Sequence, residues 1–152
     1  MHAPLSKLKV LDLSRVLAGP FAGQLLADLG ATVIKVESPK GDDTRGWGPP
    51  FIERSDGSRD AAYFHGCNRG KQSFVADLSD ATDLARVQEL VANADVLLEN
   101  FKVGGLRKYG LDHTTICAKH PGLIYCSIPG FGQEGPRATQ AGYDLMIQGL
   151  SG

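Results

Sequence analysis

A tyrosine and an aspartate, Tyr143 and Asp144, stand side by side behind a glycine in the string AGYDLMIQGLSG. The apolar residues that follow are typical of a helix, which would place the pair at its mouth. A phenol and a carboxylate there are candidates for an active site, although an unperturbed tyrosine titrates near pH ~10 and is a poor general base at neutral pH. The alternative is a purely structural role, with Tyr143 as a buried packing residue.

Basic residues recur where strands are expected to end, and such residues bind phosphate groups. In open parallel sheets, ligands bind outside the carboxyl ends of the strands. The residues in such places are Arg15, Lys40, Arg45, Lys102, Arg107 and Lys108. The stretch CNRGKQS adds Arg69 and Lys71, either as an anion-binding turn or as a tight, charged entry to a strand. For any one of the residues at strand ends a solvated surface position is the better explanation, and for the set the two explanations are about equal.

Three other kinds of site find little support. The string GFGQEG (130–135) matches G-x-G-x-x-G, but Pro136 and Arg137 follow it and no apolar helix begins there. We therefore expect a turn-forming loop and no dinucleotide site. The four histidines are scattered without ligand spacing, which argues against a metal site. No G-x-S-x-G motif occurs, and no cysteine lies in a recognisable nucleophile setting.

Five short apolar runs predict the strands that would position these residues. They are KVLDL (9–13), TVIKVE (32–37), SFVADL (73–78), DVLLENF (95–101) and LIYCSI (123–128). Most lack strict alternation of apolar and polar residues, as strands covered on both faces do. Helical patterns lie between them, and this order predicts an α/β fold with a doubly wound, mostly parallel sheet.

Three helices are predicted between these strands. Pro20 suits the first position of one helix, and Gly30 suits its C-terminal cap. Ser79 is a good N-cap for a second helix, which has apolar residues at helical spacing. A third helix is expected over 113–119.

Composition fits a single globular domain of 152 residues with a formal net charge of -1. This balance argues against general nucleic-acid binding. Two glycine-rich segments, 38–60 and 130–140, lack a periodic pattern and are expected to be loops.

The sequence also favours a cytoplasmic protein with no membrane segment. The stretch MHAPLSKLKV has no apolar core of a signal peptide, and no apolar run is long enough to span a bilayer. Cys67, Cys117 and Cys126 are odd in number without paired spacing, which indicates reduced thiols.

Taken together, several strings resemble family III CoA-transferases, a group that includes formyl-CoA and carnitine CoA-transferases and α-methylacyl-CoA racemases. The matching strings are VLDLSRVLAGPFAGQLLADLGATVIKVE, GDDTRGWGPPF, NRGKQSF, ADVLLENF, LIYCSIPGFGQEGP and AGYDLMIQGLSG. The resemblance implies a Rossmann-like large domain that holds coenzyme A or acyl-CoA, with no metal, in an interlocked homodimer. It also implies a nucleophilic aspartate that forms an aspartyl-CoA thioester between donor and acceptor acids.

Carried over by position, the resemblance implies roles for individual residues. Val16, Leu17 and Ala18 would line the thiol end of CoA, and Asn100, Phe101 and Lys102 would flank its nucleotide. Lys108 would stand where the family often has a phosphate-binding arginine, and lysine lacks the bidentate fork. Arg69 and Lys71 match the family's basic turn. Ser38 occupies a position where some relatives place a basic CoA contact, for which Lys40 is a substitute.

The resemblance also bears on the opening pair. Asp144 corresponds to a supporting carboxylate, because the family's nucleophilic aspartate lies in a later segment. Residues 1–152 are thus expected to be the N-terminal part of the large domain and to be inactive alone. Racemases of the group have a histidine where this chain has Tyr143, so a transferase is favoured.

Two alternatives stay open: a racemase-type isomerase, and a non-catalytic CoA-binding or interaction module. The string GDDTRGWGPPF resembles branches acting on small dicarboxylic acids such as succinate or glutarate. Arg45 could clamp the second carboxylate, although pairing with Asp42 or Asp43 explains it equally well.

Overall fold

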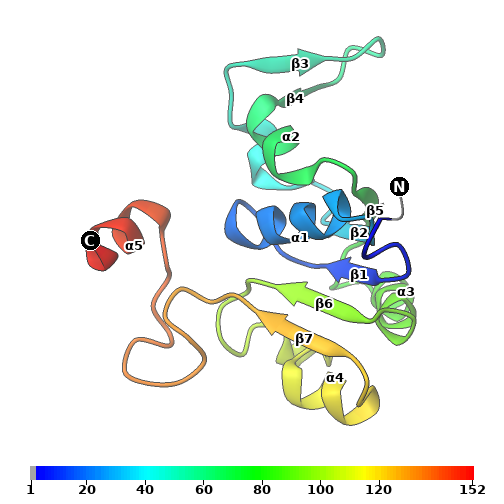
Figure 1. The fold of residues 1–152 in the computed structure, drawn as a ribbon, viewed down its shortest axis with the longest axis vertical. Coiled ribbons are helices and arrows are strands. Elements are labelled where there is room, and N and C mark those ends of the chain that lie inside the picture. Colours follow the sequence, from blue (N-terminus) through cyan, green and yellow to red (C-terminus); the bar gives the residue numbers. More distant parts are fainter. Residues whose placement is uncertain (1–2) are drawn as a thin grey trace.

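The computed structural model describes residues 3–152, and at its centre lies a five-stranded parallel sheet (Figure 1). The strands are β1 (Lys9–Asp12), β2 (Thr32–Glu37), β5 (Gln72–Val75), β6 (Val96–Glu99) and β7 (Ile124–Ser127), in the order β5-β2-β1-β6-β7. Each neighbouring pair is parallel. The five predicted strands and the doubly wound, Rossmann-like α/β fold are therefore confirmed.

Helices connect these strands on both faces of the sheet. They are α1 (Ala18–Asp28), α2 (Ala62–Asn68), α3 (Ala81–Ala92) and α4 (His113–Lys119), with 3-10 turns η1 (Asp43–Gly46) and η2 (Arg107–Tyr109); helix α5 (Asp144–Ser151) follows the last strand. Over residues 3–152, no helix combines the length and the apolar character that crossing a membrane requires.

Two helix starts differ from the prediction. Helix α1 begins at Ala18, so Pro20 is its third residue and not its first. Proline is tolerated there because the first N–H groups of a helix have no intrahelical partner. Helix α3 is capped by Asp80, whose carboxylate accepts from two backbone N–H groups, and not by Ser79. The C-cap of α1 is Leu29, and Gly30 follows it with a left-handed φ of 102°, at the position after the cap where glycine is favoured.

Hydrophobic clusters lie on both faces of the sheet. Successive side chains of a strand point to opposite faces. Leu11 of β1 accordingly packs in the cluster that contains Val87 of α3, whereas its neighbour Val10 packs in the cluster that contacts Leu26 of α1. Because both faces are covered, apolar residues run continuously along the strands, as the sequence indicated.

The segment predicted as one long loop contains regular structure. Residues 38–60 hold η1, strand β3 (Phe51–Glu53) and most of strand β4 (Arg59–Ala61), which pairs antiparallel with β3. Helix α2 follows directly and was also missed. Three-residue strands are too short for a period-2 pattern to stand out. In Figure 1 the hairpin projects from the body of the fold beyond α2.

The chain after β7 runs through a loop to α5, which lies beyond the carboxyl ends of β6 and β7 (Figure 1). The two ends of this loop meet at Gly130 and Gly142. A Cβ atom on either glycine would overlap the backbone of the other. Two chain segments can touch this closely only where neither carries a side chain.

Candidate functional site

The carboxyl ends of β1, β2 and β6 border a cavity of about 220 Å³. Arg15, Ser38, Asp77, Phe101 and Tyr109 are among the residues that line it. The guanidinium carbon of Arg15 lies 5.8 Å from the centroid of the Phe101 ring, within cation–π range. Arginine binds phosphates and stacks on planar groups. The pair of Arg15 with Phe101 therefore suits an anionic ligand that carries an aromatic ring, and three carboxylates line the same cavity.

The turn between β1 and α1 borders this cavity, and distant residues hold its backbone. The side-chain amide of Asn100 donates to the carbonyl of Arg15 at 2.7 Å and accepts from its N–H at 2.8 Å. The next residue, Val16, has a left-handed φ of 71° and donates its N–H to Asp42 Oδ2 at 3.3 Å. Val16, Leu17 and Ala18, three of the predicted CoA contacts, thus lie at the start of α1.

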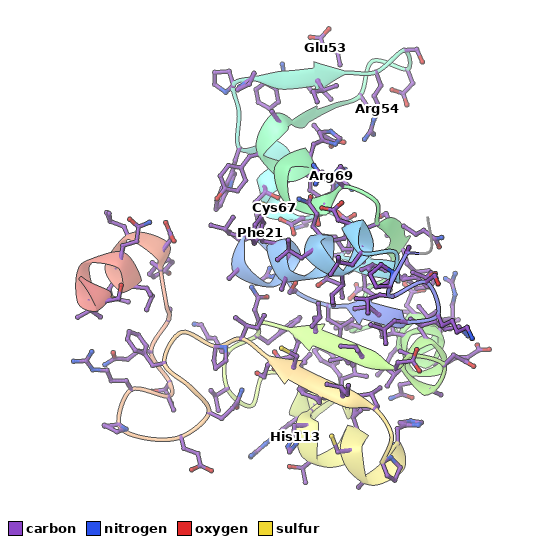
Figure 2. All side chains as sticks on the ribbon, viewed as in Figure 1. Phe21, Glu53, Arg54, Cys67, Arg69 and His113 are labelled. Atoms are coloured by element: carbon purple, nitrogen blue, oxygen red, sulfur yellow. The ribbon has the colours of Figure 1, made fainter. Side chains whose placement is uncertain are left out.

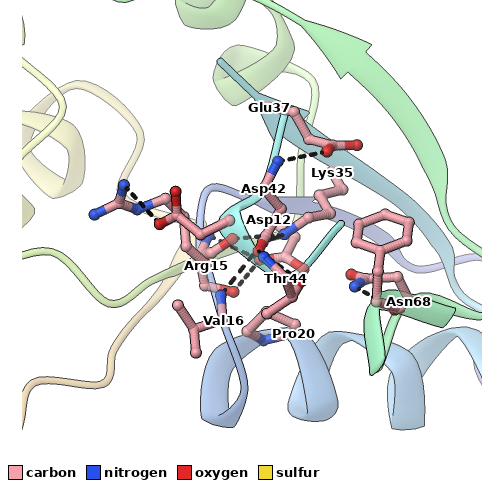
Figure 3. A network of polar contacts seen from close by, with 12 residues as sticks. Asp12, Arg15, Val16, Pro20, Lys35, Glu37, Asp42, Thr44 and Asn68 are labelled. Carbon is pink, nitrogen blue, oxygen red and sulfur yellow. Dashed lines mark hydrogen bonds and ion pairs between the residues drawn. The ribbon is translucent and has the colours of Figure 1, made fainter. Parts of the chain in front are cut away.

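Beneath the turn lies a network of buried charges, drawn in Figure 3. Lys35 Nζ, in the middle of β2, pairs with Asp42 Oδ2 at 2.9 Å and donates to the Ser14 carbonyl at 2.7 Å. Burial acts to raise the pKa of Asp42, but the charge of Lys35 and hydrogen bonds from Lys35 and Thr44 hold that pKa below its usual range. Asp42 is therefore an anion at neutral pH.

The geometry of Lys71 does not match the prediction that it binds CoA. Its side chain is only 2% exposed, and Nζ donates to Asp12 Oδ2 at 2.8 Å, the Pro20 carbonyl at 2.7 Å and Asn68 Oδ1 at 2.9 Å. An ammonium group has three donors. All three are thus used inside the protein, and Lys71 fixes the first turn of α1.

Arg45 also has internal partners, and they differ from the Asp42 or Asp43 suggested by sequence. It forms a bidentate pair with Glu37, with both distances 2.7 Å, and donates to Asp60 at 2.9 Å. The guanidinium carbon lies 3.7 Å from the centroid of the Phe64 ring. Arg45 therefore joins β2, η1 and the hairpin into one unit, and this leaves few donors for a substrate carboxylate.

The remaining basic residues are spread around the cavity and beyond it. Lys40, Lys102 and Lys108 are exposed, Lys102 lining a smaller hollow of about 40 Å³. Arg69, which follows α2 and is labelled in Figure 2, pairs with Asp28 of α1 at 2.6 Å and 3.1 Å. Arg69 is not among the residues that line the cavity.

Tyr143 and Asp144 begin α5, away from the cavity. Tyr143 is 73% exposed, so its interpretation as a buried packing residue is wrong. Asp144 is also exposed, and its Oδ2 accepts from Gln148 Nε2 one turn later at 2.7 Å. In residues 3–152 this pair meets none of the other predicted site residues within hydrogen-bond distance.

Sequence reasoning missed the buried charged residues. Asp12, Lys35, Glu37 and Asp42 are each at most 4% exposed. A signal was present, because Asp12, Lys35 and Glu37 interrupt apolar strands, and a charge in a buried strand requires a partner. The partners could not be found by spacing, since Lys71 and Asp12 lie 59 residues apart.

The cysteines and the possible metal ligands add no reactive group to the site described above. Cys67, Cys117 and Cys126 are free thiols, and burial raises the pKa of Cys67, which disfavours a reactive thiolate. Among residues 3–152, no group of three His, Cys, Asp or Glu side chains is placed to hold a metal ion. His2 lies outside the described residues.

Comparison with known proteins relates the chain to one group of enzymes. It is 60% identical over 151 residues to the succinate–glutarate CoA-transferase of Agrobacterium fabrum, covering 98% of this chain and 38% of that protein. It is 47% identical to succinyl-CoA:glutarate CoA-transferase of Mus musculus, covering 98% and 33%. The crystal structure of a CaiB/BaiF family protein from Brucella suis superimposes with a TM-score of 0.95 at 61% identity, covering 99% of this chain and 39% of that one.

The chain thus spans about two fifths or less of the length of these relatives. The sequence profile of CoA-transferase family III matches residues 5–152, which is nearly all of the chain. The parallel sheet, the turn after β1 and the cavity at the strand ends occur in a chain that belongs to CoA-transferase family III.

Proposed function

We propose that the enzyme containing this segment transfers coenzyme A between small dicarboxylic acids, with succinate and glutarate as the first pair to test. The observation that carries the proposal is the 60% identity, over 98% of the chain, to a succinate–glutarate CoA-transferase. In the mechanism that the family implies, an aspartate takes the acyl group and then holds CoA as a thioester. Coenzyme A thiolate, released by the first attack, attacks the aspartyl carbonyl and expels the donor acid. The acceptor carboxylate then displaces the thiolate from the thioester, and the thiolate takes the acceptor acyl group and frees the aspartate.

The proposed CoA site is the cavity at the ends of β1, β2 and β6. Its guanidinium and aromatic ring suit a ligand built from adenine and phosphates, and exposed lysines stand next or close in sequence to residues that line it. Phe101 and Arg15 would contact the nucleotide, and Lys40, Lys102 and Lys108 would neutralise phosphates. The turn residues Val16, Leu17 and Ala18 would face the thiol end.

Residues 1–152 would form the N-terminal part of the CoA-binding large domain. We propose that the complete enzyme is a cytoplasmic homodimer whose nucleophilic aspartate lies in a later segment, with Asp144 and Tyr143 in supporting roles. Arg45, Lys71 and Arg69 each pair with a carboxylate of the protein, which favours a structural role over the predicted contacts with substrate or CoA. They would keep the loops around the site in place, and substrate would not contact them.

The direct test is to incubate the complete enzyme with succinyl-CoA and glutarate and follow glutaryl-CoA by liquid chromatography. We expect glutaryl-CoA and succinate in equal amounts. Hydroxylamine should trap one aspartate as a hydroxamate, and only when an acyl-CoA is present. Absence of both products would overturn the proposal. Exchange of the α-proton of a 2-methylacyl-CoA in deuterated water, without acyl transfer, would instead establish an isomerase.

A further inference from the structure

Val16 adopts a backbone conformation that is costly for its residue type. Its φ of 71° lies in the left-handed region, and it is the only non-glycine residue of 3–152 with a positive φ. A β-branched side chain disfavours this region because it crowds the neighbouring carbonyl groups. Such a conformation persists only where the surroundings impose it, and it is frequent at functional sites.

Three side chains from separate parts of the sequence impose this turn, and Figure 3 labels two of them, Lys35 and Asp42. Asn100 bonds both backbone groups of Arg15. Lys35 Nζ binds the carbonyl of Ser14 at 2.7 Å. Asp42 Oδ2 accepts the N–H of Val16 itself and also pairs with Lys35. Asp42 is thus the group that touches the strained residue and anchors the lysine beside it.

We propose that Asp42 is a positioning residue, which holds Val16 in the left-handed conformation and thereby places Val16, Leu17 and Ala18 at the thiol end of CoA. The effect of Asp42 on CoA transfer rests on the proposed function. Asp42 lines the cavity, but it is only 3% exposed and both of its oxygens are held by internal partners, so a direct part in binding substrate is not needed to explain its effect. Its effect would be transmitted through the backbone of Val16.

The two oxygens of Asp42 have separate partners, and this permits a matched control. Oδ2 serves Val16 and Lys35, whereas Oδ1 accepts from the N–H of Thr44 at 3.0 Å and from its hydroxyl at 2.7 Å. Asp42→Asn replaces one carboxylate oxygen by a donor and so removes an acceptor. Thr44→Val removes one hydrogen bond to the same carboxylate and leaves Oδ2 facing Val16.

The test compares four forms of the complete enzyme: Asp42→Asn, Thr44→Val, Val16→Gly and the double variant D42N/V16G. We expect D42N to lower kcat/KM for succinyl-CoA about tenfold, which corresponds to roughly 1.4 kcal/mol. T44V should change it by less than about twofold. Glycine adopts a positive φ without strain, so V16G in the D42N background should recover a large part of the loss.

A second readout separates positioning from general damage. Adenosine 3′,5′-bisphosphate probes only the nucleotide end of the site, and its inhibition constant should stay the same in D42N. Equal effects of D42N and T44V, no rescue by V16G, or a parallel loss of bisphosphate affinity would each overturn the proposal. If D42N does not fold, D42N/K35Q leaves no buried charge unpaired, and recovery by V16G in that background tests the turn held jointly by Asp42 and Lys35.

Failure of the proposed function would be visible separately. A wild-type enzyme without CoA transfer would refute that function. The urea midpoints of the four forms would still test the turn, because V16G should stabilise the D42N protein more than the wild type. Additive midpoints would mean that Asp42 does not hold Val16.

Discussion

At the scale of single residues, the main feature is a set of buried charges that are paired with one another. Asp12 pairs with Lys71, Asp42 with Lys35, and Glu37 with Arg45. A buried pair contributes little net stability compared with apolar residues of the same shape, but removal of one partner leaves an uncompensated charge. These pairs therefore act on geometry, because each joins a loop near the cavity to the sheet or to α1.

The pair of Lys71 with Asp12 gives a prediction with a control two residues away. Lys71→Met leaves the Asp12 carboxylate buried without its cation and should lower the free energy of unfolding by about 3–5 kcal/mol. Arg69→Met breaks an exposed pair with Asp28 and should cost less than about 1 kcal/mol. Urea unfolding of the two variants and the wild type measures how much free energy of unfolding each substitution removes. Similar costs would show that Lys71 is not buried as described.

At the scale of elements, the sequence predicted what depends on local pattern. The five sheet strands and α4 were found because apolar runs, caps and breakers lie within the segment itself. The hairpin of β3 and β4 was missed, since its stability depends on Arg45 contacts to Glu37 and Asp60. Ser79 and Asp80 both have good capping side chains, so the sequence alone could not show that Asp80 is the N-cap of α3. Only the path of the backbone distinguishes the two positions.

The loop between β7 and α5 gives a prediction at this scale. Gly142→Ala places a methyl group against the backbone of Gly130, and backbone cannot move aside as a flexible side chain can. Overpacking of this kind costs about 1–3 kcal/mol and should displace α5, with Tyr143 and Asp144. Hydrogen exchange of the α5 amides should accelerate in this variant.

The matched control for that experiment is Gly149→Ala, in the same helix. A Cβ on Gly149 meets no atom within 4 Å, and alanine is a better helix former than glycine by about 1 kcal/mol. We expect slower exchange in α5 for G149A. Equal exchange in G142A and the wild type would mean that the two loop ends do not meet at the glycines.

At the scale of the whole molecule, the sequence predicted which residues follow the strand ends at one edge of the sheet, but not how the charged ones pair with one another. Parallel topology alone places Arg15 and Phe101 at the same edge of the sheet, so that part followed from the strand order. Whether a basic side chain faces the cavity or the interior depends on carboxylates brought from elsewhere. Lys71 and Arg45 point into the protein because they pair with Asp12 and Glu37, whereas Lys40, Lys102 and Lys108 are exposed.

The same carboxylates set how stability depends on pH. Burial acts to raise the pKa of Glu37, but hydrogen bonds from Arg45 and Ser73, with the charge of Arg45, hold it below the usual value of 4.5. The pKa of Asp42 is likewise held below 3.8, by Lys35 and Thr44 against the effect of burial. In the pH range just below these values, the unfolded chain therefore binds more protons than the folded protein.

The stabilisation from both groups is fully present above their unfolded pKa values and is lost as pH falls through the folded ones. We expect the free energy of unfolding, from urea titrations at a series of pH values, to decrease steadily below about pH 5. Glu37→Gln should flatten this decrease, because it removes one carboxylate that takes up a proton on unfolding. Glu53→Gln, at an exposed position of β3, serves as the control. A slope unchanged by E37Q would show that the Glu37–Arg45 pair does not link the pH dependence to the fold.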